Sequence, residues 1–214
     1  MRMVRSLGAQ ASEVRLPGQL VGLDGLIIPG GESTTMGLLM EAYGLMGPLR
    51  DFVAKHPVFG TCAGLIMLAK QTTDGEQPLL GVMDITVRRN AFGRQLRSFE
   101  ASVKLSLGGS GASPGAKVGA STGVSTGVTE TAATATEAAP PAGGTEGIMR
   151  GVFIRAPWVE EMGPGVEPVA RYDDHVVGVK QGLMLGVAFH PELGEDTRLH
   201  QHFLEMIRKT EGSA

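Results

Sequence analysis

One pentapeptide constrains the fold more than any other feature, because it requires a sharp turn from a strand into a helix. Residues 60–64 read GTCAG, after the apolar run 57–59 and before a helical stretch at 65–70. Glycine on both sides lets the backbone bend where a side chain would block it. The turn holds Cys62, the one cysteine of the 214 residues, at a helix start that favours a thiolate. We interpret Cys62 as a nucleophile; the alternative is a buried structural cysteine.

A candidate base follows another predicted strand. The apolar run 184–189 ends in His190, Pro191 and Glu192. In an open α/β sheet, chemistry collects at the carboxyl ends of the strands, so a histidine there can reach a cysteine that leaves a neighbouring strand. Glu192 is placed, across a rigid proline, to accept a hydrogen bond from the other ring nitrogen of His190 and to fix its tautomer.

A second glycine-rich turn reads PGGESTT at 29–35, after the apolar strand residues 26–28. Gly30 and Gly31 allow close backbone approach and expose their amides, and Ser33 is predicted to be the N-cap of the next helix. Such a loop can bind an anion or a developing oxyanion. It lacks the ending of a phosphate-binding P-loop. An ordinary capped turn between a strand and a helix remains the alternative.

These motifs together resemble those of the class I (triad) glutamine amidotransferases, and more closely those of the glutaminase subunits of pyridoxal 5′-phosphate synthases. The motifs are PGGESTT at 29–35, GTCAGL at 60–65, FHPEL at 189–193, RNAFGRQ at 89–95 and GVFIRAP at 151–157. They occur in the family's order, and the resemblance covers most of residues 7–105 and 148–208.

The resemblance implies a catalytic triad. Cys62 would attack the side-chain amide of L-glutamine and form a glutamyl thioester. His190 would accept the thiol proton and later protonate the leaving ammonia, and Glu192 would orient His190. The backbone N–H groups of Gly31 and Ala63 would stabilise the oxyanion.

The resemblance also implies a substrate site and a partner. The glutamine site would consist of Gly31, Glu32, Ser33, Arg89, Ile154 and Arg155. Arg155 suits the substrate α-carboxylate, because a guanidinium binds a carboxylate in a fork; surface ion pairs are the alternative for both arginines. Ammonia would pass to a synthase subunit, a (βα)8 barrel, which makes pyridoxal 5′-phosphate. That compound is the product of the complex, and we expect this chain to bind no cofactor.

The order of predicted elements favours an α/β fold. We expect a three-layer, flavodoxin-like arrangement, with a mostly parallel sheet flanked by helices, in one domain over residues 1–214. Strands are predicted at 25–29, 57–61, 84–88, 99–104, 151–155, 166–171, 175–181 and 184–189, and helices at 34–43, 47–55, 63–70 and 195–209. The strands at 84–104 and 166–181 are expected to pair in antiparallel fashion.

The resemblance implies that an amino-terminal segment is missing. Family members begin with a buried strand, a short Leu-Gln-Gly loop and a helix, and this chain begins within that helix. The absent strand would be central in the sheet, so its loss would leave a neighbouring strand unpaired and lower stability. An incomplete gene model or splice form is favoured over a damaged enzyme.

Residues 106–147 form a low-complexity segment that contains 31 Gly, Ala, Ser or Thr among 42 residues and no aromatic residue. This composition buries too little apolar surface to offset the entropy of ordering. We predict a disordered insertion between two strands, with Val103 and Gly151 close together, because a fold tolerates long loops. A regulatory or docking loop is the alternative.

Composition excludes several classes of function. A net charge of −3 and a pI near 6.0 give no electrostatic basis for binding nucleic acid or an anionic membrane. No apolar stretch reaches the roughly 20 residues of a bilayer span. One cysteine forms no internal disulfide, which indicates a cytoplasmic, reducing compartment; an organelle-targeting segment before the first residue stays open. His200 and His202 lie two apart on a predicted helix and face different ways, so we predict no metal site.

Two other functions compete with the glutaminase. The chain could be another cysteine hydrolase of the same fold, such as a γ-glutamyl hydrolase. It could also be a truncated subunit that binds the synthase without catalysis. Ammonia release from free glutamine would separate these readings.

Overall fold

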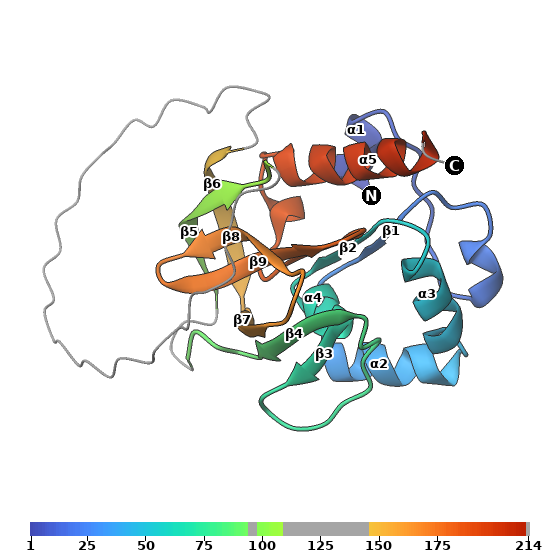
Figure 1. The fold of residues 1–214 in the computed structure, drawn as a ribbon, viewed down its shortest axis with the longest axis horizontal. Coiled ribbons are helices and arrows are strands. Elements are labelled where there is room, and N and C mark those ends of the chain that lie inside the picture. The colour runs from blue at the N-terminus through green and yellow to red at the C-terminus, as the bar shows by residue number, and fades with distance from the viewer. Residues whose placement is uncertain (94–97, 109–145, 213–214) are drawn as a thin grey trace, which may run out of the picture.

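The structure is a computed structural model that describes residues 1–93, 98–108 and 146–212. In these residues ten strands form one mixed sheet, with helices on both of its faces (Figure 1). The helices are α1 (Arg2–Ser6), η1 (Pro17–Leu20), α2 (Ser33–Ala42), α3 (Met46–Val53), α4 (Ala63–Leu68), η2 (Pro191–Leu193) and α5 (Arg198–Glu211). The strands are β1 (Leu26–Ile28), β2 (Val58–Thr61), β3 (Ala69–Thr72), β4 (Met83–Arg88), β5 (Ser98–Ser106), β6 (Glu146–Ile154), β7 (Trp158–Met162), β8 (Glu167–Tyr172), β9 (His175–Gln181) and β10 (Met184–Val187). The predicted α/β class is confirmed.

The strand order explains where the predicted motifs meet. The sheet runs β1-β2-β10-β9-β7-β4-β3, and β5 and β8 connect β6 to β9. β1 and β10 both pair with β2 in parallel, and β3 pairs with β4 in parallel, whereas the other pairs are antiparallel. Parallel pairing is thus the minority among the described strands and is concentrated at β1, β2 and β10, so the sheet is mixed and not mostly parallel as predicted. The carboxyl ends of these three strands lie at the same edge, so the turns that follow them come together.

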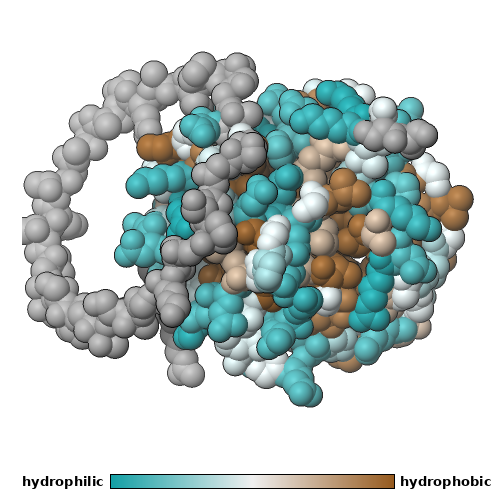
Figure 2. Space-filling view, in the orientation of Figure 1, coloured by the Kyte–Doolittle hydropathy of each residue, from teal (hydrophilic) through white to brown (hydrophobic). Residues whose placement is uncertain are grey.

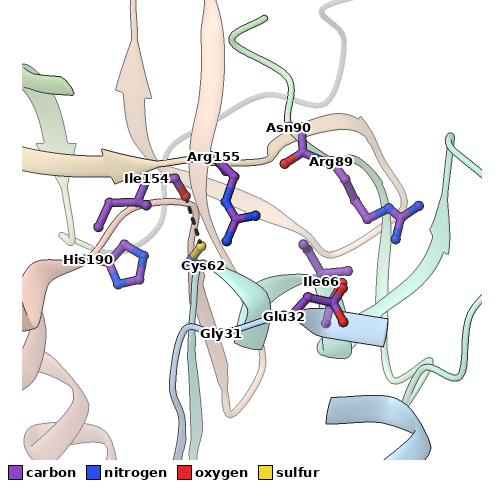
Figure 3. A pocket seen from close by; sticks show the side chains of 10 residues that line it. Gly31, Glu32, Cys62, Ile66, Arg89, Asn90, Ile154, Arg155 and His190 are labelled. Carbon is purple, nitrogen blue, oxygen red and sulfur yellow. Dashed lines mark hydrogen bonds between the residues drawn. The ribbon is translucent and has the colours of Figure 1, made fainter. Parts of the chain in front are cut away.

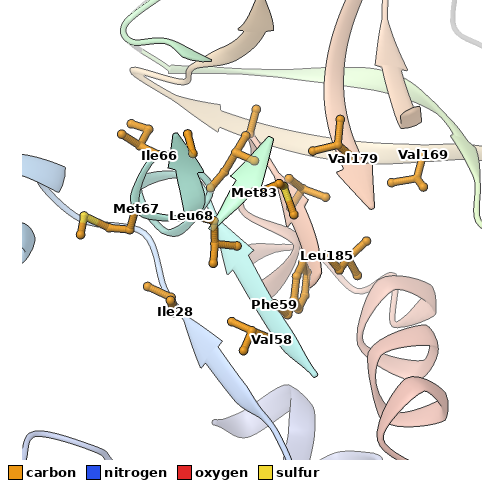
Figure 4. Close-up of a cluster of buried hydrophobic side chains, with 14 of the residues drawn as sticks. Ile28, Val58, Phe59, Ile66, Met67, Leu68, Met83, Val169, Val179 and Leu185 are labelled. Carbon is orange, nitrogen blue, oxygen red and sulfur yellow. The ribbon is translucent and has the colours of Figure 1, made fainter. Parts of the chain in front are cut away.

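Alternate residues of β2 face the two helical layers. The Phe59 ring lies on the α5 side, with its centroid 5.8 Å from that of Phe203. The opposite face is covered by α4, where Leu65 is fully buried. A Cβ added to Gly186 on β10 would lie 2.5 Å from Leu65 Cδ1, so glycine lets α4 pack close to the sheet. The central strands are therefore buried on both faces, as parallel strands require (Figure 4).

The observed elements differ from the predicted ones in one helix and one additional strand. The helix predicted at 63–70 ends at Leu68, because the Met67 and Leu68 carbonyls accept hydrogen bonds from Leu80 and Val82, and the chain continues as β3. A strand not predicted, β7, lies between β4 and β9. Its pattern of one buried residue among exposed neighbours is a weak strand signal, and its pairing with β4 gives it that conformation.

The outer edge of β1 carries no strand among the described residues. β1 pairs with β2 alone, and α1 is the only α-helix before it there. In Figure 2 the outward surface of α5 is largely hydrophilic, while hydrophobic residues gather between α5 and α3, around β1. The expectation that a central strand is absent from the sheet stays a prediction. None of the described helices has both the length and the apolar character needed to cross a membrane.

The low-complexity segment connects two paired strands. β5 and β6 are antiparallel neighbours, and Ser106 lies opposite Glu146. A Cβ added to Gly151 would lie 2.8 Å from Val103 Cγ2, so the expected closeness of these two residues is confirmed. Residues 109–145, to which most of the predicted disorder refers, lie outside the described residues. The assignment of 1–214 to one domain with an insertion at 106–147 stays a prediction.

Candidate active site

Cys62 stands at the predicted sharp turn between β2 and α4. Its φ is +49° and its ψ −104°, a backbone conformation that side chains rarely adopt. A Cβ on Gly60 would lie 2.6 Å from the Gly64 carbonyl, and one on Gly64 would lie 2.8 Å from the Ile28 carbonyl carbon. The Cys62 amide donates to the Val187 carbonyl at 2.8 Å and ties the turn to β10. The turn predicted from the glycines is confirmed.

His190 leaves the neighbouring strand β10 and faces Cys62. Its Nδ1 lies 2.8 Å from Glu192 Oε1, which leaves Nε2 for the sulfur. Hydrogen bonds with Cys62 and then with Glu192 raise the pKa of His190 to about 10, against the opposing effect of burial. The imidazole is therefore cationic at neutral pH, and a cation beside a sulfur stabilises the thiolate that attacks a substrate.

Glu192 lies behind His190, away from the cavity. Burial, the largest single effect, raises the pKa of its carboxyl, but the hydrogen bond from His190, a backbone hydrogen bond and the nearby imidazoles together outweigh it, and the pKa falls below the ordinary value. The carboxylate is thus ionised while it accepts the hydrogen bond from His190 Nδ1. An ionised acceptor on Nδ1 fixes the orientation of the ring and, once Nε2 has given up its proton, its tautomer, as the sequence predicts for this pair.

A cavity of about 230 Å³ opens beside the sulfur. Its wall contains both reactive side chains and every residue predicted for the substrate site (Figure 3). The lining residues are Gly31, Glu32, Ser33, Cys62, Ile66, Arg89, Asn90, Ile154, Arg155 and His190. The cavity thus brings together segments that follow β1, β2, β4, β6 and β10.

The two predicted oxyanion donors belong to the turns that follow β1 and β2. Ala63 is buried and is the first residue of α4, where backbone N–H groups have no partner within the helix. Gly31 lines the cavity directly before the N-cap of α2. Ala63 and Glu192 are the predicted site residues that do not line the cavity itself.

The two arginines of the cavity are in different situations. Arg89 donates to Gln77 and to the Asp74 carbonyl, and its Nε lies 3.7 Å from the Asp74 carboxylate. Arg155 has φ +45°, and no described residue pairs with its guanidinium. Figure 3 shows Arg155 pointing toward the space beside Cys62, while Arg89 lies at the far side. The ion-pair reading therefore applies to Arg89, and Arg155 is available for an anionic group.

The prediction that Ser33 caps α2 was wrong. The N-cap is Glu32, whose carboxylate accepts hydrogen bonds from the amides of Thr34 at 3.1 Å and Thr35 at 2.7 Å. Ser33 is the first helical residue, and its hydroxyl donates to Gln77 Oε1 at 3.0 Å. A glutamate reaches two amides at once, so it displaces the shorter serine from the capping position.

The cap makes the stability of the fold depend on pH. Hydrogen bonds from the Thr35 hydroxyl, the Thr35 amide and the Thr34 amide lower the pKa of Glu32 from 4.5 to about 2. Its contribution is present above pH 4.5 and is lost as the pH falls toward 2. Glu32→Gln should lower the free energy of urea unfolding at pH 7, and the difference from wild type should shrink below pH 4.5. Glu41→Gln, later on the same helix, is the control. A difference independent of pH would contradict the prediction.

Gly30 packs against the Cε1 atom of the His190 ring, a contact that the sequence did not indicate. A Cβ added there would lie 3.0 Å from His190 Nδ1 and closer still to Cε1. Gly30→Ala should therefore displace the imidazole and lower kcat by about 100-fold, a typical cost of a misplacement of about 1 Å. The melting temperature should change little, because the obstacle is a side chain. Gly18→Ala, where the added Cβ meets nothing within 4 Å, is the control. Unchanged kcat in Gly30→Ala would show that His190 moves freely.

Two lining residues, Ile66 and Asn90, were not predicted. Ile66 lies four residues after Cys62 on α4, so helical spacing places both on one face. Asn90 lies within a quoted motif and has φ +47°, which asparagine tolerates better than most residues. Both signals were present in the sequence. Among the residues that the structure describes, no group of His, Cys, Asp and Glu could hold a metal ion.

Comparisons with known proteins agree with this geometry. A protein-family model described as the SNO glutamine amidotransferase family matches residues 1–111 and 144–209. The chain is 46% identical over 210 residues to the "Pyridoxal 5'-phosphate synthase subunit PdxT" of Geobacillus kaustophilus, which covers 98% of this chain and 88% of that protein. The protein of the same name from Geobacillus thermodenitrificans is 45% identical over 210 residues, 98% of this chain and 89% of the relative. A crystal structure of a glutamine amidotransferase superposes with a TM-score of 0.75 at 40% identity and covers 96% of this chain and 90% of that one.

Proposed function

This chain belongs to the SNO glutamine amidotransferase family, and from that premise we propose that it is the glutaminase subunit of a pyridoxal 5′-phosphate synthase. It hydrolyses L-glutamine to glutamate and ammonia through Cys62, His190 and Glu192. The observation that carries the proposal is that Cys62 and His190, the latter hydrogen-bonded through Nδ1 to Glu192, line one cavity together with all six predicted substrate residues.

The proposed reaction has two steps. The Cys62 thiolate attacks the amide carbon of glutamine, and the amides of Gly31 and Ala63 stabilise the resulting oxyanion. The oxyanion collapses, the carbon–nitrogen bond breaks, and His190 gives its proton to the departing ammonia. His190 then accepts a proton from the water that attacks the thioester, and collapse of the second oxyanion breaks the carbon–sulfur bond, which releases glutamate and regenerates the Cys62 thiolate beside the protonated His190. Glu192 keeps the imidazole in one orientation throughout.

Recognition of glutamine is assigned to the cations and amides of the cavity wall. The Arg155 guanidinium would bind the α-carboxylate in a fork, since it has no other partner among the described residues. Arg89 and the Glu32–Ser33 segment would close the opposite side. The side-chain amide then points toward Cys62, where the reaction requires it.

The ammonia is proposed to pass to a synthase subunit with a (βα)8-barrel fold. The curated relatives carry the name of a synthase subunit, which supports a function in trans rather than alone. We assign the reaction to the cytoplasm, a reducing compartment in which a single unpaired thiol persists.

The experiment is ammonia release from free glutamine by the purified chain, with and without a pyridoxal 5′-phosphate synthase barrel subunit. Release that the synthase stimulates is the expected result. A chain that cleaves γ-glutamyl peptides but not free glutamine would instead be a γ-glutamyl hydrolase. A chain that binds the synthase without releasing ammonia would be the non-catalytic subunit.

A further inference from the structure

The connection between β3 and β4, residues 73–82, carries a residue that contacts two walls of the cavity. Gln77 Oε1 accepts hydrogen bonds from Ser33 Oγ at 3.0 Å, Thr34 Oγ1 at 3.2 Å and Arg89 Nη1 at 2.7 Å. Ser33 and Thr34 begin α2, whereas Arg89 directly follows β4. One oxygen therefore joins two segments that lie 55 residues apart in the sequence.

The same connection holds the Arg89 guanidinium from a second direction. Arg89 Nη2 donates to the Asp74 carbonyl at 2.9 Å, and the Arg89 amide donates to the Asp74 carboxylate at 3.0 Å. A guanidinium is a planar fork, so partners on two of its nitrogens fix its plane as well as its place. Asp74 and Gln77 thus determine where this cation meets the cavity.

The connection is itself anchored firmly enough to act as a frame. Arg50 on α3 donates to the carbonyls of Leu79 and Leu80 at 3.0 and 2.8 Å. A Cβ added to Gly37 on α2 would lie 2.5 Å from the Pro78 carbonyl oxygen, so the helix packs directly on the connection. Displacement of Gln77 is therefore opposed from both α2 and α3.

The way the Gln77 amide is used indicates that its oxygen is the functional atom. Three donors converge on Oε1, whereas Nε2 is buried and has no hydrogen-bond partner in the structure. A buried amide nitrogen without a partner is unfavourable, because it has lost its hydrogen bonds to water. A nonpolar side chain would avoid that cost, so what the position requires is the acceptor oxygen.

We propose that Gln77 is a positioning residue for glutamine binding, which acts by holding Ser33 and Arg89 at a fixed separation across the cavity. The inference rests on the proposed glutaminase function. Gln77 makes no hydrogen bond with the Cys62–His190–Glu192 series, so its loss affects substrate binding and leaves the chemical step intact. A residue of this kind changes KM and not kcat.

The test compares Gln77→Leu, Gln77→Glu and the matched control Gln71→Leu in the complex with the synthase subunit. Gln71 is exposed on β3, and its side chain makes no hydrogen bond with the described residues. Gln77→Leu should raise KM for glutamine about tenfold, the size expected for losing hydrogen bonds that include one from a charged donor. Its kcat and the rate of Cys62 alkylation by iodoacetamide should stay within about twofold of wild type. Gln77→Glu keeps the acceptor and should restore KM; Gln71→Leu should match wild type.

Several outcomes would overturn the inference. These are a wild-type KM in Gln77→Leu, a raised KM in Gln77→Glu, or a fall in the kcat of Gln77→Leu as large as the rise in its KM. If Gln77→Leu does not fold, Gln77→Met, which keeps the length of the side chain without an acceptor oxygen, takes its place. Calorimetric binding of glutamine separates this inference from the proposed function. If glutamine binds but no ammonia is released, the proposed glutaminase function is contradicted, and the dissociation constants of glutamine for wild type and the Gln77 variants still decide the role of Gln77. If glutamine does not bind at all, both are overturned.

Discussion

Replacing Cys62 by alanine is expected to lower kcat/KM for glutamine hydrolysis by about 10⁴-fold or more, because no other group in the cavity can form the thioester. The fold should persist, since alanine keeps the Cβ and removes only the sulfur from a buried position. Ammonia release in the presence of the synthase measures the loss, and thermal unfolding of the same sample shows that the chain is intact. Activity within tenfold of wild type would mean that Cys62 is not the nucleophile.

Glycine at the same position gives a second, independent result. The backbone of Cys62, at φ +49° and ψ −104°, is strained for any residue with a Cβ. Cys62→Gly should therefore be about 1 kcal/mol more stable than Cys62→Ala, although both are inactive. This strained turn places the sulfur at the wall of the cavity, so the fold is less stable in exchange for reactivity. Equal unfolding free energies for the two variants would contradict this account.

Strain at the site is not confined to the nucleophile. Four described residues other than glycine have positive φ, and Cys62, Asn90 and Arg155 are three of them. All three line the same cavity. Residues held in unfavourable backbone conformations gather where the surrounding structure must aim a side chain. The left-handed turn at Arg155, directly after β6, is what points its guanidinium toward the space beside Cys62 (Figure 3).

The site could be predicted in large part because its chemistry is local in the sequence. The bend at residues 60–64 depends on two glycines beside one cysteine. In the structure a Cβ added to either glycine would clash with neighbouring backbone, as this reading requires. His190 and Glu192 are two residues apart, so their hydrogen bond requires little beyond their own segment. The strand predicted at 84–88 is observed at Met83–Arg88, only one residue longer. The prediction was close because the alternation of buried and less buried residues is also a local signal.

The residues that were not predicted depend on contacts between distant segments. Gly30 matters because the His190 ring, 160 positions later, occupies the space that a side chain at residue 30 would need. Gln77 matters because Ser33 and Arg89 both donate hydrogen bonds to its side-chain oxygen. Neither contact has a periodic or compositional signature. The strand β7 has the same origin, since Glu161 and Glu160 would be ordinary surface residues without the hydrogen bonds that Thr86 and Arg88 of β4 donate to them.

Replacing Gly64 by alanine should have the largest effect on stability, because the added carbon meets backbone rather than a side chain. It would lie 2.8 Å from the Ile28 carbonyl carbon and closer still to the carbonyl oxygen. A side chain could rotate away from such a clash, but Ile28 is held in β1 by its pairing with Gly60. Either α4 or β1 must shift, so we expect a loss of at least about 3 kcal/mol, at the upper end for overpacking.

The control for this prediction is the same change on another helix. Gly47 lies in α3, and a Cβ added there meets nothing within 4 Å, so Gly47→Ala should be neutral or stabilising by about 0.5–1 kcal/mol. Comparing the free energies of denaturant unfolding of Gly64→Ala and Gly47→Ala cancels the general effect of replacing a helical glycine by alanine and leaves the effect of the clash. If Gly64→Ala unfolds at the wild-type midpoint, α4 can move relative to β1. The close packing of the helix on the sheet would then not be what sets the position of Cys62 at the head of α4.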